Sequence, residues 1–279
     1  VYGNTALYLP PVAFVQDPLR WLELASEYRA TVLPCPNFAL QRCLDAAERE
    51  PHRLTQLYLT SVKSLVPSAE PVSAQQMLNF WQRFADCGLA LSAIKPSYGL
   101  AEATLIAAGT RAPEPVLLDV DRDALLRTEV MIHAAPGPNT RRYVGCGNDF
   151  GQQQLRIVQP DESRFCGQNE VGEIWLSGAA VAGGYWQRDA ETQHTFQARV
   201  AGDNHHWLRT GDLGFLHQGQ LFITGRLKES IIIRGECYYP NDFEATAVAT
   251  HLLAVRDGAD AFSLPAPQQE EESRCGALA

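Results

Sequence analysis

The chain has 279 residues and a formal net charge of −9, with 46% hydrophobic and 20% charged residues. Its length allows one large domain or two small ones. The negative charge argues against a nucleic-acid ligand, because phosphate binding needs a basic surface, and no apolar run approaches the roughly 20 residues that span a bilayer.

The seven cysteines are an odd number and include no C-x-x-C pair. Structural zinc sites need clustered cysteines, so this spacing argues against zinc. We therefore expect free, buried thiols and a cytoplasmic protein, because the cytosol keeps thiols reduced.

Residues 1–112 alternate between helical and extended patterns, which is typical of a layered α/β sheet. Helices are predicted to start at residues suited to cap them, namely Asp17, Asn37 and Ser73, and a further helix near Ala101. Short apolar runs between them predict strands at residues 31–33, 62–66 and 89–94. The Pro34-Cys35-Pro36 step is expected to end the first of these strands.

Residues 113–227 are rich in glycine, proline and short alternating runs, which predicts a small β-barrel or sheet. Its expected strands are residues 155–158 and 173–176, and a hairpin of residues 213–216 and 220–224. Residues 228–279 are expected to start a third unit. It comprises a strand at residues 230–234, a helix opened by Asn241 with Glu244, and a loop or frayed end from residue 265.

The segment from Tyr98 to Thr104 follows a predicted strand and opens a predicted helix, which is a position where α/β sheets bind ligands. The Tyr98 ring can stack on a flat base, Gly99 allows close approach to the backbone, and Glu102 offers a hard oxygen ligand for magnesium. Glu102 is equally explained as an acidic residue in the first turn of a helix.

Two later segments carry charged groups suited to a nucleotide. Asp212 can accept hydrogen bonds from two adjacent hydroxyls, as on a ribose, and Arg226 can form forked hydrogen bonds to phosphate or ribose oxygens. Each has a simpler interpretation, because Gly-Asp is a common turn dipeptide and residues 225–230 could be a charged linker between domains. The glycine-bracketed strand at residues 172–178 is expected to give structural support only.

In their order along the chain, these segments resemble the motifs of the adenylate-forming superfamily, which comprises acyl-CoA synthetases, peptide-synthetase adenylation domains and luciferases. The finer pattern resembles its fatty acyl-AMP ligase branch. The stretches that carry this resemblance are PSAEPV at residues 67–72, PSYGLAEATL at 96–105, RTGDLGFL at 209–216 and LFITGRLKESIIIRG at 221–235. Residues 117–147, with RRYVGCG at 141–147, resemble the insertion that separates acyl-AMP ligases from acyl-CoA ligases.

The resemblance implies a role for particular residues. The implied nucleotide-binding residues are Ser68, Ala69 and Glu70 at the adenine edge, Tyr98 stacked on the ring with Ser97 and Gly99 beside it, Asp212 on the ribose hydroxyls, Ile223 beside the sugar and Arg226 on ribose or phosphate. Glu102 would hold magnesium. Lys228 would be the hinge about which a small C-terminal domain rotates.

The resemblance also implies a fold and an activity. Residues 1–112 would be part of the α/β subdomain of a large adenylation domain, 113–227 its β-rich subdomain with the insertion, and 228–279 part of the mobile C-terminal domain. The implied reaction uses ATP and Mg²⁺ to turn a fatty acid into an acyl-adenylate. The acyl group then passes to the phosphopantetheine thiol of an acyl carrier protein.

Two family features are expected to lie outside the chain. The phosphate-binding loop would precede Val1, and no lysine follows Lys228 to serve as the catalytic lysine of the C-terminal domain. We therefore expect these 279 residues alone not to form acyl-adenylate at an enzyme-like rate. Two alternatives are an acyl-CoA ligase and a non-catalytic nucleotide- or acyl-binding relative. The presence of Tyr98, Glu102, Asp212 and Arg226 together argues against the second.

Overall fold

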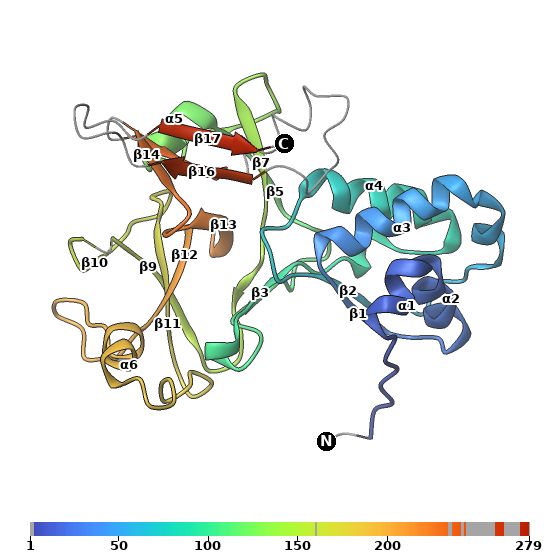
Figure 1. The fold of residues 1–279 in the computed structure, drawn as a ribbon, viewed down its shortest axis with the longest axis horizontal. Helices are drawn as coiled ribbons and strands as arrows, with labels where there is room; N and C mark the ends of the chain where they lie inside the picture. Colours follow the sequence, from blue (N-terminus) through green and yellow to red (C-terminus); the bar gives the residue numbers. More distant parts are fainter. Residues whose placement is uncertain are drawn as a thin grey trace.

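The computed structural model describes residues 3–159, 161–233, 236–240, 243, 260–264 and 274–278. The four α-helices between residues 11 and 84 gather on one side of the molecule, and the long antiparallel strands lie on the other (Figure 1). Residues 3–10 extend away from the helical side as an arm with no regular structure (Figure 1). Within the described ranges, no helix has both the length and the apolar character that crossing a bilayer requires.

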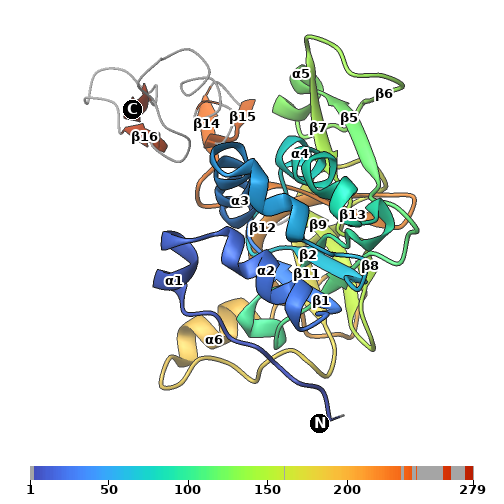
Figure 2. The ribbon, with the colours of Figure 1, turned by 90° about the vertical axis from the view of Figure 1, so that its right-hand side faces the viewer.

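The helical side is an α/β unit. Its elements, in chain order, are α1 (Pro11–Gln16), α2 (Leu19–Glu27), β1 (Val32–Cys35), α3 (Asn37–Arg49), η1 (Pro51–Gln56), β2 (Ser64–Pro67), α4 (Ala74–Phe84), η2 (Ala85–Cys87), η3 (Leu91–Ala93) and β3 (Ser97–Tyr98). Strands β1 and β2 pair in parallel. An isolated parallel bridge joins Leu65 of β2 to Ile94, so the segment before β3 lies beside β2. Figure 2 looks onto this helical side of the molecule. The predicted α/β architecture is confirmed.

Two local predictions in this unit are wrong. Strand β1 continues through Pro34 to Cys35. Among the described strands it pairs with β2 alone, so the missing N–H of Pro34 can face away from the ladder. Residues 91–93 form a 3₁₀ turn rather than a strand, because the Ile94 N–H donates to the Leu91 carbonyl at 3.0 Å.

The helix caps were predicted correctly only at α4. There the Ser73 hydroxyl accepts from the Gln76 N–H at 3.4 Å. No side-chain cap is present at the start of α2 or α3. Asp17 pairs instead with Arg53, and the Asn37 amide donates to the Pro71 carbonyl at 2.7 Å. Both side chains are therefore used in contacts between distant segments.

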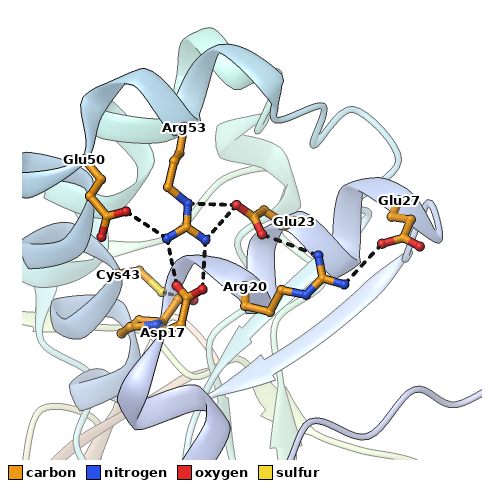
Figure 3. A network of polar contacts seen from close by, with 8 residues as sticks. Asp17, Arg20, Glu23, Glu27, Cys43, Glu50 and Arg53 are labelled. Carbon is orange, nitrogen blue, oxygen red and sulfur yellow. Dashed lines mark hydrogen bonds and ion pairs between the residues drawn. The ribbon is translucent and has the colours of Figure 1, made fainter.

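Arg53 joins three carboxylates from separate elements of the α/β unit (Figure 3). Its guanidinium donates to both oxygens of Asp17 at 2.9 and 3.0 Å, to Glu23 at 2.9 Å and to Glu50 at 3.1 Å. The hydrogen bond from Arg53 lowers the pKa of Asp17 below its usual value, and burial opposes this shift. The network ties α2 and Asp17, in the turn between α1 and α2, to η1 and the end of α3.

A buried apolar core fixes the helices to one another. It includes Leu22 of α2, Leu40 of α3, and Met77, Phe80 and Phe84 of α4, all fully buried. Burial of each such side chain contributes about 1.5–3 kcal/mol relative to exposure. Met77, Phe80 and Phe84 lie on the buried face of α4.

The other side of the molecule is β-rich, as predicted. Its remaining elements are η4 (Ala101–Ala103), β4 (Ala108–Gly109), β5 (Leu117–Asp121), α5 (Arg122–Leu126), β6 (Ile132–His133), β7 (Thr140–Val144), β8 (Asn148–Asp149), β9 (Gln154–Gln159), β10 (Arg164–Phe165), β11 (Gly172–Ser177), α6 (Asp189–Phe196), β12 (Leu208–His217) and β13 (Gln220–Arg226). The largest sheet has the order β10-β9-β11-β12-β13, with every pair antiparallel. The predicted β12–β13 hairpin is confirmed.

Residues 117–144 form a separate antiparallel sheet with the order β6-β5-β7. Single bridges from Gly145 to Phe222 and from Glu129 to Glu170 join this sheet to the large one. The buried cluster that contains Phe222 draws on both sheets, with Val120 and Tyr143 from one and Phe215 from the other. These two sheets are joined by single bridges, and β4 and β8 form a third sheet with β3, so complete closure into a barrel stays a prediction.

Four short strands follow in the C-terminal region, β14 (Ile231–Ile233), β15 (Glu236–Tyr238), β16 (Asp260–Leu264) and β17 (Arg274–Leu278). They form two antiparallel pairs, β14–β15 and β16–β17. The loop predicted from residue 265 is therefore wrong for residues 274–278, because they pair with β16. The helix predicted at Asn241 and Glu244 lies outside the described residues, and the domain boundaries stay predictions.

Candidate functional site

Tyr98 and Asp212 meet although they lie far apart in the chain. The Tyr98 hydroxyl donates to Asp212 Oδ2 at 2.7 Å. Tyr98 lies in β3, which pairs with β4, and it is only 6% exposed within an apolar cluster that includes Ala107 and Leu176. Packing therefore fixes the ring, and the hydrogen bond fixes the direction of the hydroxyl.

Arg226 approaches the other oxygen of the same carboxylate. Asp212 faces Arg226 across the β12–β13 pair, and Arg226 Nε lies 3.3 Å from Asp212 Oδ1. Ile223 of β13 packs against the cluster that contains Tyr98. The structure thus brings together four of the predicted nucleotide-binding residues, from β3, β12 and β13.

Burial sets the proton affinities in this group. It raises the pKa of Asp212, while the hydrogen bond from Tyr98 and the charge of Arg226 act in the opposite direction. Burial also raises the pKa of Tyr98 well above its usual value, and the charge of Asp212 adds to this shift. Tyr98 is therefore protonated at neutral pH and is the donor in the pair.

Gly99 is required by the loop in which it lies. A Cβ atom on this residue would clash with the backbone oxygen of Leu105. The loop closes where the Ala107 N–H donates to the Tyr98 carbonyl at 2.9 Å. The loop that contains Gly99 fills the space where a side chain would lie, so local packing explains why this residue is a glycine. Contact of a ligand with Gly99 or with the buried Ser97 stays a prediction.

Residues 68–70 follow β2 and lie near the start of α3. The Ser68 N–H donates to the Cys35 carbonyl at 3.0 Å, and the Glu70 carboxylate accepts from the Asn37 N–H at 2.6 Å. Ala69 is exposed and has a φ of 75°, in the left-handed region. Val72 packs against both the helical core and the cluster of Tyr98, which places this loop between the two units.

Glu102 lies in the short 3₁₀ turn η4 rather than in the first turn of an α-helix, so the predicted helix near Ala101 is wrong. The Glu102 carbonyl accepts from the Ala182 N–H at 2.8 Å, and its carboxylate accepts from the Tyr185 hydroxyl at 2.8 Å. Burial, with the bond to Glu102, raises the pKa of Tyr185 to about 12. No ligand-binding role was predicted for Tyr185 from the sequence.

A buried ion pair beside Asp212 was also missed. The Glu173 carboxylate accepts from Arg209 Nε at 3.0 Å and from the Gly211 N–H at 3.0 Å. Glu173 is 1% exposed. The signal in the sequence was that Glu173 is the one charged residue of the strand predicted at residues 173–176. Lys228, the predicted hinge, is exposed in the turn between β13 and β14.

Tyr98 lies just after the parallel β1–β2 unit, and Asp212 and Arg226 come from the antiparallel β12–β13 pair. Residues 1–186 match the family model for the AMP-binding enzyme. The chain therefore belongs to the family of AMP-binding enzymes.

Similar proteins give this membership more detail. The chain is 39% identical over 257 residues to the medium-chain-fatty-acid–[acyl-carrier-protein] ligase JamA of Moorena producens, covering 90% of this chain and 43% of JamA. It is 38% identical to the long-chain-fatty-acid–AMP ligase FadD32 of Mycobacterium marinum, covering 96% of this chain and 45% of FadD32. The chain thus spans less than half the length of these relatives.

Solved structures resemble the fold closely. One from studies of fatty acyl-adenylate ligases of E. coli and L. pneumophila has a TM-score of 0.80 at 30% identity, covering 91% of this chain and 45% of that one. The L. pneumophila fatty acyl-adenylate ligase in complex with acyl adenylate and pyrophosphate has a TM-score of 0.73 at 34% identity, covering 96% of this chain and 46% of the ligase. The predicted partial adenylate-forming fold is confirmed.

Proposed function

We propose that the protein containing this chain uses ATP to activate a fatty acid as an acyl-adenylate, and that it passes the acyl group to the phosphopantetheine thiol of an acyl carrier protein. A carboxylate oxygen of the fatty acid attacks the α-phosphorus, and pyrophosphate leaves. The carrier thiolate then attacks the acyl carbon, and AMP leaves with the bridging oxygen. The single observation that supports this most is the hydrogen bond from Tyr98 to Asp212 beside Arg226.

That geometry suits an adenosine phosphate. Asp212 offers carboxylate oxygens to the ribose hydroxyls, and Arg226 is exposed with donors left for ribose or phosphate oxygens. The bond to Asp212 uses the Tyr98 hydroxyl, so contact with adenine would fall to the small part of the ring that its 6% exposure leaves open. Tyr98 would therefore connect the base and sugar subsites, with residues 68–70 at the adenine edge and Ile223 beside the sugar.

Glu102 is the residue we assign to magnesium. Among the described residues, no three histidine, cysteine or carboxylate side chains are grouped to bind a metal, and this agrees with magnesium, which is usually bound by one or two carboxylates plus waters and phosphates. The ion would neutralise charge on the phosphates. Tyr185 donates to Glu102 Oε1 and would fix the direction of the carboxylate.

The names of the relatives favour a carrier protein over coenzyme A as the acceptor. JamA and TtuA, a second relative at 38% identity from Teredinibacter turnerae, are both named as ligases of medium-chain fatty acids to acyl carrier protein. A direct test offers coenzyme A and a holo-acyl carrier protein side by side to the full-length protein after it has formed acyl-adenylate. Transfer to coenzyme A alone would contradict this part of the proposal.

Fatty-acid-dependent exchange of labelled pyrophosphate into ATP tests the activation step in the full-length protein. Asp212→Asn should lower kcat/KM for ATP roughly tenfold to a hundredfold, since a hydrogen bond to a charged group contributes about 1.5–3 kcal/mol. Asp119→Asn is a matched control, because Asp119 also faces an arginine, Arg142, across a strand pair at 2.9 Å. Absence of exchange in the wild type, or equal losses in both variants, would contradict the proposal.

A further inference from the structure

We propose that Glu173 is the positioning residue for Asp212, and that its buried carboxylate sets how selectively the site recognises the ribose hydroxyls. The inference rests on the ribose role proposed above for Asp212. Glu173 itself reaches no ligand, because it is buried beneath the backbone of Gly211. It acts by fixing the backbone path of the residues on either side of Gly211, one of which is Asp212.

Asp212 lies in an irregular part of the β11–β12 pair. Glu173 pairs with Leu213, and Trp175 pairs with Arg209. Between these two pairs, a single residue of β11, Ile174, faces the three residues 210–212 of β12. A bulge of this kind re-aims side chains, and it leaves backbone groups without ladder partners. Asp212 is paired with Arg226 on its β13 side, but on its β11 side it depends on other contacts for its direction.

Side chains provide those contacts. The Thr210 hydroxyl donates to the Ile174 carbonyl at 2.6 Å and accepts from the Asp212 N–H at 3.1 Å. The Gly211 N–H donates to Glu173 Oε1 at 3.0 Å, and Gly211 has a φ of 73°. Together these bonds define the path of residues 210–212.

Arg209 completes the arrangement from the opposite side of Glu173. Its Nε and Nη2 atoms lie 3.0 and 2.9 Å from Glu173 Oε2, and its guanidinium lies over the Trp175 ring, 5.6 Å from the centroid. Each Glu173 oxygen thus has its own partner, one in the bulge and one in the arginine. A buried ion pair of this kind adds little net stability compared with apolar residues of equal volume. Its main effect here is therefore to hold the backbone of residues 210–212 in position.

The same bulge also contacts the end of β13. The Gly211 carbonyl accepts from the Leu227 N–H at 2.8 Å, one residue after Arg226. A displacement of Gly211 would therefore move both groups that face the ribose. Glu173→Gln keeps the size of the side chain but has only one acceptor oxygen, so its NH₂ group must face either the Gly211 N–H or the donors of Arg209, and one of these two contacts is lost. The bulge should then lose its fixed position.

The test compares ATP with 2′-deoxy-ATP and 3′-deoxy-ATP in fatty-acid-dependent pyrophosphate exchange by the full-length protein. We expect Glu173→Gln to lower the selectivity ratio, kcat/KM for ATP over that for each deoxy analogue, by about tenfold, since small misplacements of a binding group have effects of this order. Both substrates are measured on one preparation, so the folded fraction cancels from the ratio. Arg209→Lys keeps the positive charge but loses the guanidinium group whose two nitrogens contact Glu173. It gives the same test if Glu173→Gln fails to fold.

Glu170→Gln is the matched control. Glu170 also binds an arginine, Arg164, and accepts a backbone N–H, from Gly167 at 3.1 Å, but none of its contacts involves residues 209–212. Its ratio should equal that of the wild type. Asp212→Asn separates the two proposals. If it leaves the ratio unchanged, the ribose role fails. If it lowers the ratio while Glu173→Gln and Arg209→Lys do not, the positioning role alone is overturned.

Discussion

The Tyr98 hydroxyl satisfies one oxygen of a carboxylate that is largely buried, and this defines what its removal should do. In Tyr98→Phe, Asp212 loses a hydrogen bond that lowers its pKa, while burial, which raises it, is unchanged. The pKa of Asp212 should therefore rise further. If the charged carboxylate binds ribose, the acid limb of the pH profile of kcat/KM for ATP should move to higher pH.

The pH dependence of pyrophosphate exchange by the full-length protein measures this shift. Tyr143→Phe serves as the control, because Tyr143 is equally buried at 4% exposed but belongs to the other cluster, with Phe215. An acid limb that stays in place in Tyr98→Phe, or that moves equally in both variants, would show that the Tyr98–Asp212 bond does not govern binding. If kcat/KM for ATP falls equally at every pH and the acid limb does not move, the loss comes from altered packing around residue 98 and not from the pKa of Asp212.

At the scale of elements, Arg53 provides a test of stability. Arg53→Met leaves Asp17, Glu23 and Glu50 without their common partner (Figure 3). The free energy of unfolding should fall by about 2 kcal/mol at neutral pH, a value that allows for screening of the exposed Asp17 and Glu50. Because the pKa of Asp17 is lowered in the folded state, this stabilisation is present above its unfolded value of about 4 and is lost as the pH falls below it.

Thermal unfolding of the full-length protein, followed from pH 7 down to about pH 2, measures the effect. The difference between wild type and Arg53→Met should be large at pH 7 and should shrink as the pH falls through the lowered pKa of Asp17. Arg20→Met is the control, since Arg20 contacts Glu23 and Glu27 only at 3.4 and 3.5 Å on the surface. Equal losses in the two variants would mean that the Arg53 network adds nothing beyond a surface ion pair.

The elements that were predicted correctly depend on local patterns. The Ser73 cap and the β12–β13 hairpin involve partners only a few residues apart, so spacing alone indicates them. Asp17 and Asn37 looked like caps, but their partners lie more than 30 residues away, and no local pattern reveals such contacts. Glu102 was placed in a helix because its segment continues a helical composition, yet the tight loop closed at Ala107 allows only a 3₁₀ turn.

For the molecule as a whole, the family motifs predicted the residues of the candidate site, and the structure adds how some of them meet. The bond between Tyr98 and Asp212 joins β3 to β12 across the boundary of the two units. The positions of both residues were available from the motifs, but their direct contact was not, because it depends on how the units pack. Glu173 was missed for the same reason, since its partners become visible only when β11 and β12 are paired.

Lys228 lies where the chain leaves the large sheet, and a hinge there should affect one half-reaction only. The neighbouring amides of Leu227 and Glu229 donate to the carbonyls of Gly211 and Arg226, and a proline at 228 removes neither bond. Lys228→Pro should therefore leave pyrophosphate exchange by the full-length protein largely intact. Because proline fixes φ, it should slow transfer to a holo-acyl carrier protein by tenfold or more, about 1.4 kcal/mol in the barrier.

Lys228→Ala is the control, because it removes the side chain but still allows rotation of the backbone. Both half-reactions of this variant should stay close to wild type. If Lys228→Pro slows pyrophosphate exchange and acyl transfer equally, rotation about residue 228 is not the movement that takes the protein from the first half-reaction to the second.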